Sequence, residues 1–424
     1  MVNNMTDDYQ NKETLHVVVV GNVDDGKSTL LGRLLFDSRS IFEDQLQALC
    51  QVSEKRGENN VNLALLSDAL RAEQDQGITI EVAHHFFSTP QRKFVFIDTP
   101  GHIQHTRNMI TGASTANLVV MLIDARKGIA EQTRRHTIIA SLLGIKHMMV
   151  VVNKMDLVDY REDIFELIKA NLGNFSSRLD FLTIDYIPVC ALHGDNIVNI
   201  SLKMPWYKGN TLLNQLENFS FNTITEITGG RFPVQYVVGL NSNDFQDYQA
   251  YAGRVAGGEF KTGSKVIVLP SKTSTYIKSI NQGQNSLEIA FPPMSVTMQL
   301  TDEIDIRRGD LIVSGNDLPE ISREFDAMIC WCSTAKLIPG NHYLLMQVAR
   351  EVRCSIKSIS YKIDINSGNK INGVEEAGLN DIVRVSIKTL HNICFDKYST
   401  NHVTGSLILV DETSNETLGA GMII

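Results

Sequence analysis

The hydrophobic residues in the first half of the chain form two alternating patterns. Short apolar runs with β-branched residues, typical of parallel strands buried on both faces, lie within 16–21, 93–98, 118–124 and 147–153. Residues 81–88 alternate between apolar and polar positions, as expected of an edge strand. Apolar positions at helical spacing occur at 28–36, 103–114, 131–144 and 160–173. This alternation predicts a doubly wound α/β sheet.

The pattern changes near residue 220. Beyond it, short strand-like segments are separated by Gly, Asn, Pro and Asp, and helical windows are few. One group of these segments extends over 231–315 and a second from about 325 to 424, which favours two small antiparallel β-barrels. The predicted parts are therefore a flexible N-terminus at 1–14, an α/β domain at 15–222, and barrels at 228–322 and 323–424.

Composition limits the function. With 424 residues, the chain is long enough for more than one core, and its net charge of -9 disfavours bulk binding to nucleic acid or to anionic membranes. No segment approaches the roughly 18 to 20 apolar residues of a membrane span, and the polar N-terminus is unlike a signal peptide. The six cysteines have no zinc-finger or redox spacing. We therefore expect a cytoplasmic protein that uses neither membrane nor nucleic acid.

The segment 21–28 has the pattern G-x-x-x-x-G-K-S, between a predicted strand and a predicted helix. Such a loop turns its backbone N–H groups toward phosphate oxygens, while Lys27 reaches the β and γ phosphates and the Ser28 hydroxyl ligates Mg²⁺. An ordinary strand-to-helix turn is the alternative for this motif alone. The predicted phosphate contacts are Gly21, Asn22, Val23, Asp24, Asp25, Gly26, Lys27, Ser28 and Thr29.

Two further segments suit the same phosphates. Asp98 ends the strand 93–98 and begins D-T-P-G-H, so its carboxylate would hold a water of the Mg²⁺ shell while Gly101 lets an N–H approach the γ phosphate. Thr79 lies in the segment 76–79, between the loop and that strand, where a threonine would close over the metal. A Pro-Gly turn and a threonine at a strand start are the structural alternatives.

The sequence N-K-M-D at 153–156 ends the strand 147–153. The Asp156 carboxylate is able to accept hydrogen bonds from guanine N1–H and N2–H₂, which adenine does not offer, and a carboxylate left unpaired penalises the wrong base. An N-cap cluster is the alternative. The order and spacing of the motifs, each near a strand's carboxyl end, favour GTP with Mg²⁺, and Asn153, Lys154 and Asp156 as guanine contacts.

Together these motifs resemble the translation-factor class of GTPases, in which two β-barrels follow a GTP-binding domain. The resemblance covers essentially the whole chain. It is stronger to the GTPase subunit of bacterial sulfate adenylyltransferase than to elongation factor Tu, which typically has His at the position of Asp25 and D-C-P-G-H in place of D-T-P-G-H. The segments that carry it are 23–28, 71–80, 98–115, 124–128, 131–136 and 401–423.

The resemblance also implies residue roles. It makes His102, Lys27 and Thr79 catalytic, with His102 positioning the attacking water behind an apolar gate of Val23 and Ile78. The metal ligands would be Ser28 and Thr79, with Asp98 acting through water. Cys190, Ala191 and Leu192 match the guanine loop, in which Cys190 replaces a common serine and is expected to be tolerated, because the backbone N–H groups make the main contact. Asn22 stands where the family usually has His.

The implied activity is GTP hydrolysis that drives formation of adenylylsulfate and pyrophosphate from ATP and sulfate. The ATP chemistry would belong to a catalytic partner subunit, in a heterodimer or a higher complex. No second phosphate loop is present, so a fused adenylylsulfate kinase is not expected. The alternatives are an elongation-factor-like carrier of aminoacyl-tRNA and a regulator that binds GTP without useful turnover. The polar run Arg134-Arg135-His136 is expected to face solvent or the partner.

Overall fold

The computed structural model describes residues 12–38, 63, 82–220, 229–242 and 245–424. The chain divides into two compact units. The first comprises residues 1–222 together with 364–369, and the second comprises residues 223–363 and 370–424. In the described residues, no helix has both the length and the apolar content needed to cross a membrane.

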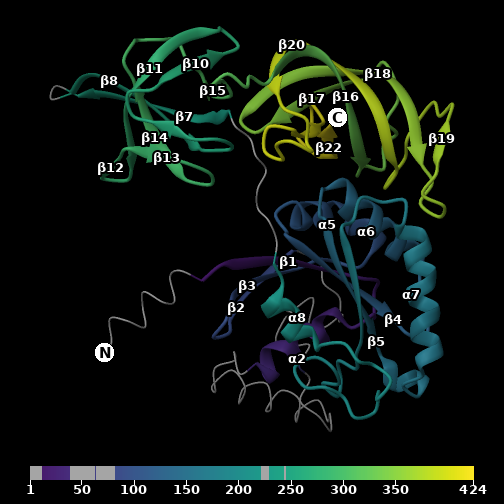
Figure 1. Cartoon of the computed structure of the whole chain (residues 1–424). Helices are drawn as coiled ribbons and strands as arrows, with labels where there is room; N and C mark the ends of the chain where they lie inside the picture. The colour runs from purple at the N-terminus through teal and green to yellow at the C-terminus, as the bar shows by residue number, and fades with distance from the viewer. Residues whose placement is uncertain (1–11, 39–62, 64–81, 221–228, 243–244) are drawn as a thin grey trace, which may run out of the picture. The chain divides into compact units, whose positions relative to one another are not determined.

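A six-stranded sheet forms the centre of the first unit, in the order β2-β3-β1-β4-β5-β6 (Figure 1). Its edge strand β2 pairs antiparallel with β3, and the other pairs are parallel. The doubly wound sheet and its predicted edge strand are thus confirmed. The strands are β1 (Thr14–Val20), β2 (Ala83–Ser88), β3 (Lys93–Asp98), β4 (Leu118–Asp124), β5 (His147–Asn153) and β6 (Thr183–Pro188).

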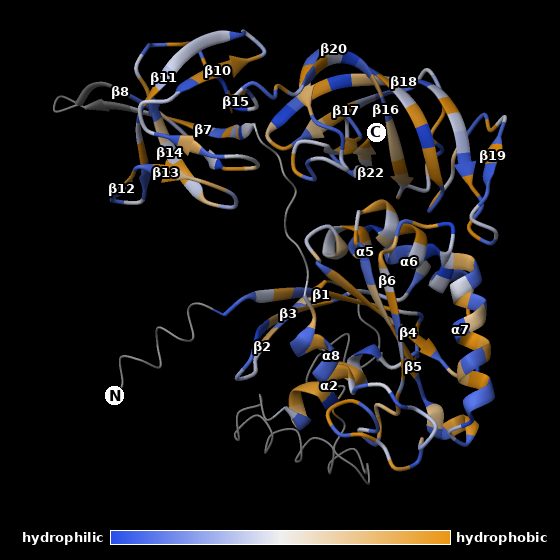
Figure 2. Cartoon of the chain, viewed as in Figure 1, coloured by the Kyte–Doolittle hydropathy of each residue, from blue (hydrophilic) through white to orange (hydrophobic). Residues whose placement is uncertain are grey.

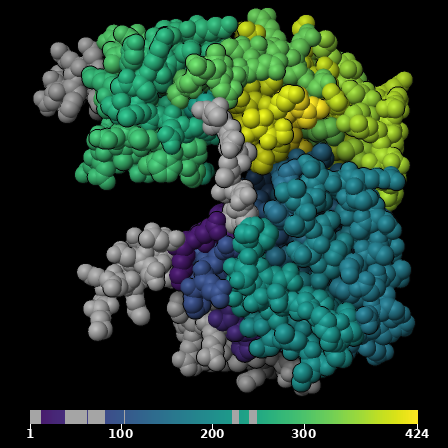
Figure 3. Space-filling view, in the orientation of Figure 1, coloured from purple at the N-terminus to yellow at the C-terminus, as the bar shows by residue number. Residues whose placement is uncertain are grey.

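Helices follow the strands of this sheet. They are α2 (Lys27–Asp37), η2 (Ile103–His105), α5 (Thr106–Ala113), α6 (Glu131–Leu142), η3 (Met155–Val158), α7 (Glu162–Ser176) and α8 (Leu212–Asn218). Leu30, Leu31 and Leu34 of α2 are buried in the same cluster as β1 and β4, each stabilising the fold by about 1.5–3 kcal/mol. The central strands are apolar along most of their length (Figure 2), and α7 forms one flank of the unit (Figure 3).

The polar end of α6 differs from expectation. Arg135 is only 5% exposed and His136 is fully buried, so the prediction that this run faces solvent or a partner is wrong for these two residues. Arg135 donates to Glu131 at 2.6 Å and to Gln132. His136 has no hydrogen-bond partner among the described residues, and burial, aided by the charges of Lys27 and Arg135, lowers its pKa to about 3. His136 therefore belongs to the core as a neutral ring.

The second unit contains two β-barrels. The first closes through pairing of β10 with β11 and has the order β10-β15-β7-β8-β14-β11, with β12 added at one edge and a separate β9–β13 pair. The strands are β7 (Gly230–Ser242), β8 (Phe245–Arg254), β9 (Phe260–Lys261), β10 (Lys265–Leu269), β11 (Thr273–Gln282), β12 (Asn285–Leu287), β13 (Ile289–Ala290), β14 (Ser295–Leu300) and β15 (Leu311–Ser314).

The second barrel closes through β17 and β18, in the order β17-β21-β22-β16-β20-β18, with β19 at the edge. Its strands are β16 (Glu320–Trp331), β17 (His342–Gln347), β18 (Arg350–Ile363), β19 (Lys370–Asn372), β20 (Ile382–Phe395), β21 (Ser406–Val410) and β22 (Thr417–Ile423). Each barrel has its own apolar cluster, the second built around Trp331. Closure leaves few open strand edges, and the predicted antiparallel barrels are confirmed.

A buried ion pair joins the residues of the two barrels. Arg231 on β7 donates from Nε to Asp396 Oδ2 at 3.0 Å and from Nη2 to Oδ1 at 2.9 Å, with the two side chains 1% and 8% exposed. Thr404 donates to the same carboxylate at 2.6 Å, and the Asp317 carbonyl accepts from Arg231 at 2.7 Å. Both charges are thus paired and hydrogen-bonded away from water.

Removing one charge of this pair should destabilise the second unit. Asp396→Asn leaves Arg231 without its buried counter-charge, so we expect a loss of about 3 kcal/mol in the free energy of unfolding. Asp317→Ala removes only a half-exposed carboxylate 3.7 Å from Arg231, and we expect a loss below about 0.5 kcal/mol. Urea unfolding followed by Trp331 fluorescence in a Trp206→Phe background measures both. Equal losses in the two variants would contradict the assignment.

The buried His136 should make the first unit sensitive to acid. Because its pKa is lower when folded than when unfolded, the unfolded state binds the extra proton, and stability falls as pH decreases below about 6.5 by up to about 1.4 kcal/mol per unit. His136→Leu should remove this part of the slope. His391→Leu, at an exposed position of the second unit, should leave it unchanged. Urea unfolding from about pH 5 to about pH 8 tests the prediction, which fails if the His136→Leu slope equals that of the unmodified chain.

Candidate functional site

The loop between β1 and α2 has the backbone of a phosphate-binding turn. Asp24 and Gly26 have positive φ angles of 66° and 94°, a geometry that turns successive N–H groups to one side. Asn22 N donates to Asp25 Oδ2 at 2.8 Å and fixes the turn. A Cβ atom at Gly26 would lie 2.5 Å from Asn153 Nδ2, so this position requires glycine. The N-terminus of α2 follows directly and favours an anion.

Lys27 is the first residue of α2, directly after this loop, and its side chain contacts the loop. The side chain is 7% exposed, and its ammonium donates to the carbonyls of Gly21 at 3.2 Å and Asn22 at 2.9 Å. Burial lowers the pKa of Lys27, against the opposing effect of nearby carboxylates, of which Asp98 acts most strongly. A buried ammonium that donates to two carbonyls, with carboxylates nearby, is well placed to exchange these carbonyls for phosphate oxygens.

The segment after β3 packs on the same loop. A Cβ atom at Gly101 would lie 2.7 Å from Lys27 Nζ and 2.8 Å from the Gly21 carbonyl. Thr99 Oγ1 donates to the Val19 carbonyl at 2.8 Å and anchors the segment to β1. The structure therefore brings Lys27, Asp98 and Gly101 together, as the sequence predicts.

These residues fit a nucleotide phosphate with Mg²⁺. Asp98 is 1% exposed, the nearby Lys27 is buried, and Ser28 is the second residue of α2, next to that lysine. Oxygen ligands and a surrounding of N–H donors suit this ion and a polyphosphate. Thr79 and Ile78 lie outside the described residues, so their predicted roles stay predictions. The Asn22 side chain donates to Thr133 Oγ1 at 3.4 Å, at the start of α6.

Asn153 connects the phosphate loop to the base-binding side. Its Nδ2 donates to the Asp25 carbonyl at 2.8 Å, and its Oδ1 accepts from Ala191 N at 2.9 Å. The side chain is 2% exposed. A single buried amide thus holds the loops that follow β1 and β6 together, at the carboxyl ends of their strands.

Lys154 is held by a carboxylate that sequence reasoning missed. Lys154 adopts a left-handed backbone conformation, with φ at 62°, and its ammonium lies 3.0 Å from Asp124 Oδ2 and donates to the Asp24 carbonyl. Burial alone raises the pKa of Asp124, but hydrogen bonds from Arg126 and Lys154 outweigh it and hold the pKa below its usual range. The position of Asp124 at the end of β4, two residues before Arg126, is the signal that could have identified it.

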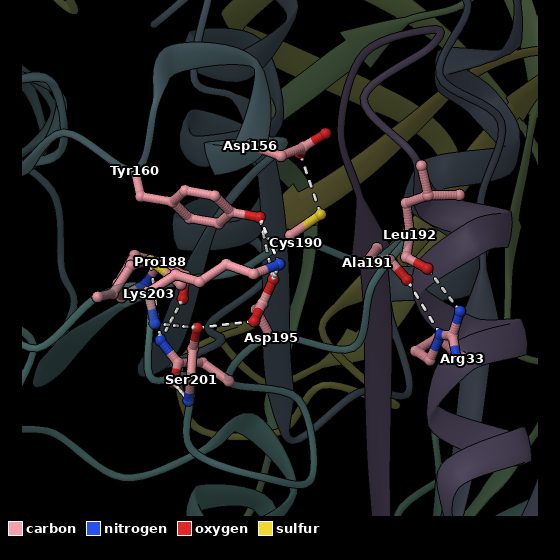
Figure 4. Close-up of polar contacts among 12 residues, drawn as sticks. Arg33, Asp156, Tyr160, Pro188, Cys190, Ala191, Leu192, Asp195, Ser201 and Lys203 are labelled. Carbon is pink, nitrogen blue, oxygen red and sulfur yellow. Dashed lines mark hydrogen bonds and ion pairs between the residues drawn. The ribbon is translucent and has the colours of Figure 1, made fainter.

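The Asp156 carboxylate lies beside the Cys190 thiol (Figure 4). The thiol donates to Asp156 Oδ1 at 3.0 Å, and burial together with this contact raises the pKa of Cys190 to about 12. The sequence predicted a guanine contact through the backbone of this loop. It missed the side-chain contact, through which Cys190 orients the carboxylate expected to select the base.

Two groups of polar contacts hold the guanine loop, and neither was predicted. Arg33 of α2 donates to the carbonyls of Ala191 at 3.2 Å and Leu192 at 2.5 Å. Asp195 accepts from Ser201 Oγ at 2.7 Å, and from Tyr160 and Lys203, each at 3.3 Å (Figure 4). The loop 190–195 is therefore fixed from both sides.

His102 precedes η2 and is half buried. Its ring meets His105 edge-on, with 6.1 Å between the ring centroids. Within the described residues no hydrogen bond joins it to the phosphate loop. Its predicted action on the attacking water therefore stays a prediction.

Comparisons with known proteins agree with this geometry. The family model of the elongation factor Tu GTP binding domain matches residues 12–223, and that of the GTP-eEF1A C-terminal domain-like family matches residues 324–424. The "Bifunctional enzyme CysN/CysC" of Mycobacterium tuberculosis is 46% identical over 97% of this chain and 67% of its own length.

Two further relatives are matched over a larger share of their own length. The "Sulfate adenylyltransferase subunit 1" of Cellvibrio japonicus is 46% identical over 98% of this chain and 88% of its own length. The protein of the same name from Bacteroides fragilis is 45% identical over 99% of this chain and 87% of its own. The chain contains a phosphate loop, an Asp156 carboxylate hydrogen-bonded to Cys190, and two closed barrels. Its relatives are 45–46% identical over nearly its whole length. The chain therefore belongs to the sulfate adenylyltransferase subunit 1 family of GTPases.

Proposed function

We propose that this chain is the GTP-hydrolysing subunit of a sulfate adenylyltransferase. GTP hydrolysis here drives the formation of adenylylsulfate and pyrophosphate from ATP and sulfate on a catalytic partner subunit. The observation that carries the nucleotide half of the proposal is the Asn153 amide, which ties the lysine-bearing loop to the loop beside Asp156. The sulfate half rests on the names of relatives that are 44–46% identical over nearly the whole chain.

The site residues have different proposed roles in binding phosphate, Mg²⁺, guanine and the attacking water. Lys27, the N–H groups of 21–29 and the N-terminus of α2 bind and orient the phosphates. Ser28, Thr79 and, through water, Asp98 would hold Mg²⁺, which supplies charge neutralisation at the phosphates when bound. Asp156 accepts from guanine N1–H and N2–H₂, and Asn153, Lys154 and residues 190–192 complete the base site. His102 positions the attacking water.

The word "subunit" in the relatives' names implies a partner subunit, and in our proposal this partner is the subunit that uses ATP. It completes a heterodimer or a higher complex in our proposal, and the cytoplasm is the location that suits the free thiols of the described cysteines. An aminoacyl-tRNA carrier is less supported, because the relatives of this identity are named for sulfate adenylyltransferase.

Replacement of Lys27 should separate GTP hydrolysis from the basal synthesis of adenylylsulfate. In a mixture with the catalytic subunit, we expect Lys27→Ala to lower GTP hydrolysis by roughly 100-fold or more, because the buried ammonium no longer neutralises phosphate charge. Adenylylsulfate synthesis should lose its stimulation by GTP and keep the basal rate of the partner. Lys169→Ala, on the exposed face of α7, is the control. Loss of the basal rate in a complex that still assembles would rule out this division of labour.

Replacement of Asp156 should change the base preference. Asp156→Asn replaces an acceptor by an amide that is able to donate to the C2 carbonyl of xanthine, so we expect GTP to bind roughly 100-fold more weakly and xanthosine triphosphate to bind better. Asp159→Asn, at an exposed position three residues away, should leave the preference for guanine unchanged. Calorimetric titration with GTP, ATP and xanthosine triphosphate measures this, and unaltered preference in Asp156→Asn would contradict the role of this carboxylate.

A further inference from the structure

The base side of the site contains a group of metal-ligating side chains whose combined chemistry the proposed function does not use. One carboxylate oxygen of Asp156, the Sγ of Cys190 and one ring nitrogen of His193 all lie within 4.8 Å of one another. Cys190 is buried, Asp156 is half buried and His193 is exposed, so the group opens to solvent on the histidine side. His193 follows Cys190 by three residues, and its N–H donates to the Cys190 carbonyl at 3.2 Å, in the turn that brings the ring beside the thiol.

The three ligands suit a thiophilic divalent cation. Thiolate, imidazole and carboxylate bind Zn²⁺ at roughly 2.3, 2.1 and 2.1 Å, which in a tetrahedral arrangement separates the ligand atoms by roughly 3.3–3.6 Å. The present Sγ to Oδ1 distance is 3.0 Å, and the ring nitrogen lies within 4.8 Å of both atoms. Rotation of the exposed His193 side chain would bring its ring nitrogen closer to the Cys190 sulfur and to the Asp156 oxygen. Three protein ligands leave the fourth position to water.

The cations near Asp156 are already paired with other carboxylates, and Arg126, whose charge also acts on Asp156, is paired with Asp124. Among the described residues, the Cys190 thiol is the one hydrogen-bond donor to the Asp156 carboxylate. The neighbouring Asp195 forms an ion pair with Lys203 at 3.3 Å and accepts a hydrogen bond from Ser201. The Lys203 charge is therefore paired with Asp195. A cation at Asp156 would replace the thiol proton, which leaves for solvent, and no electron is transferred.

We propose that Asp156, Cys190 and His193 form a binding site for Zn²⁺ or a similar thiophilic cation, and that this cation and GTP exclude each other. The exclusion rests on the proposed role of Asp156 in guanine recognition. A carboxylate that ligates the cation is turned away from guanine N1–H and N2–H₂ and partly neutralised. Zn²⁺ would therefore inhibit this chain at the base and not at the phosphates, whereas Mg²⁺, which prefers oxygen ligands, would leave the base site free.

Cobalt(II) spectroscopy on the full chain tests the site without any activity assay. Titration with Co²⁺, a spectroscopic substitute for Zn²⁺, should produce thiolate-to-cobalt charge-transfer absorption. Cys190→Ser should abolish this absorption, and His193→Ala should weaken Co²⁺ binding by more than about tenfold. Cys332→Ser changes a partly exposed thiol of the second unit and should leave the absorption unchanged. Absorption that survives in Cys190→Ser, or an unweakened His193→Ala, overturns the site.

Displacement by nucleotide tests the exclusion. GDP should remove the absorption at concentrations at which ADP, which chelates metal equally well but lacks the guanine groups, leaves it in place. Zn²⁺ should weaken GDP binding to the unmodified chain and leave it unchanged in His193→Ala. Equal effects of GDP and ADP would overturn the exclusion. Failure of the proposed function is distinguishable, because it would appear as equal binding of GTP and ATP by the metal-free chain.

Discussion

The Asn153 side chain is the contact on which the nucleotide site depends. The site is made by separate segments, and the ones that follow β1, β5 and β6 lie beyond the ends of their strands, outside the hydrogen bonding of the sheet. One amide donates to the first loop at Asp25 and accepts from the third at Ala191, while its own backbone ends β5. Because the amide is buried, its partners have no competing water, and loss of either bond would leave an unpaired polar group.

Neighbouring residues hold the Asn153 side chain and the segment after it in position. Gly26 has no side chain, and the Asn153 amide approaches to within 2.5 Å of where a Cβ would be. Lys154, directly after Asn153, is held in a left-handed conformation by Asp124 and by the Asp24 carbonyl. A strained residue persists where surrounding contacts compensate for it, and here they fix the direction in which Asp156 leaves the strand.

The sequence predicted the parts of the site that depend on residue type and spacing. Glycines at 21 and 26, Lys27, Asp98 and Asn153 could be placed because a phosphate loop and strand ends require them at those intervals. The contacts of Arg33 with the guanine loop could not be predicted, because helix α2 and the loop at 191 are more than 150 residues apart and only the fold brings them together. His136 was misjudged for a related reason: two arginines beside it suggested a polar face, whereas tertiary packing buries it.

The packing of Gly101 explains how the state of the phosphates can influence the rest of the unit. Lys27 bonds to the Gly21 and Asn22 carbonyls, and a phosphate must exchange at least part of these contacts to bind. Any such movement of Lys27 or the loop meets the backbone at Gly101, where there is no space even for a methyl group. Gly101 leads within two residues into η2 and then α5, so a displacement at the phosphates has a rigid element to move. A ligand shifts a conformational equilibrium only through contacts that differ between the two states, and we expect such a difference where Gly101 approaches the lysine closely.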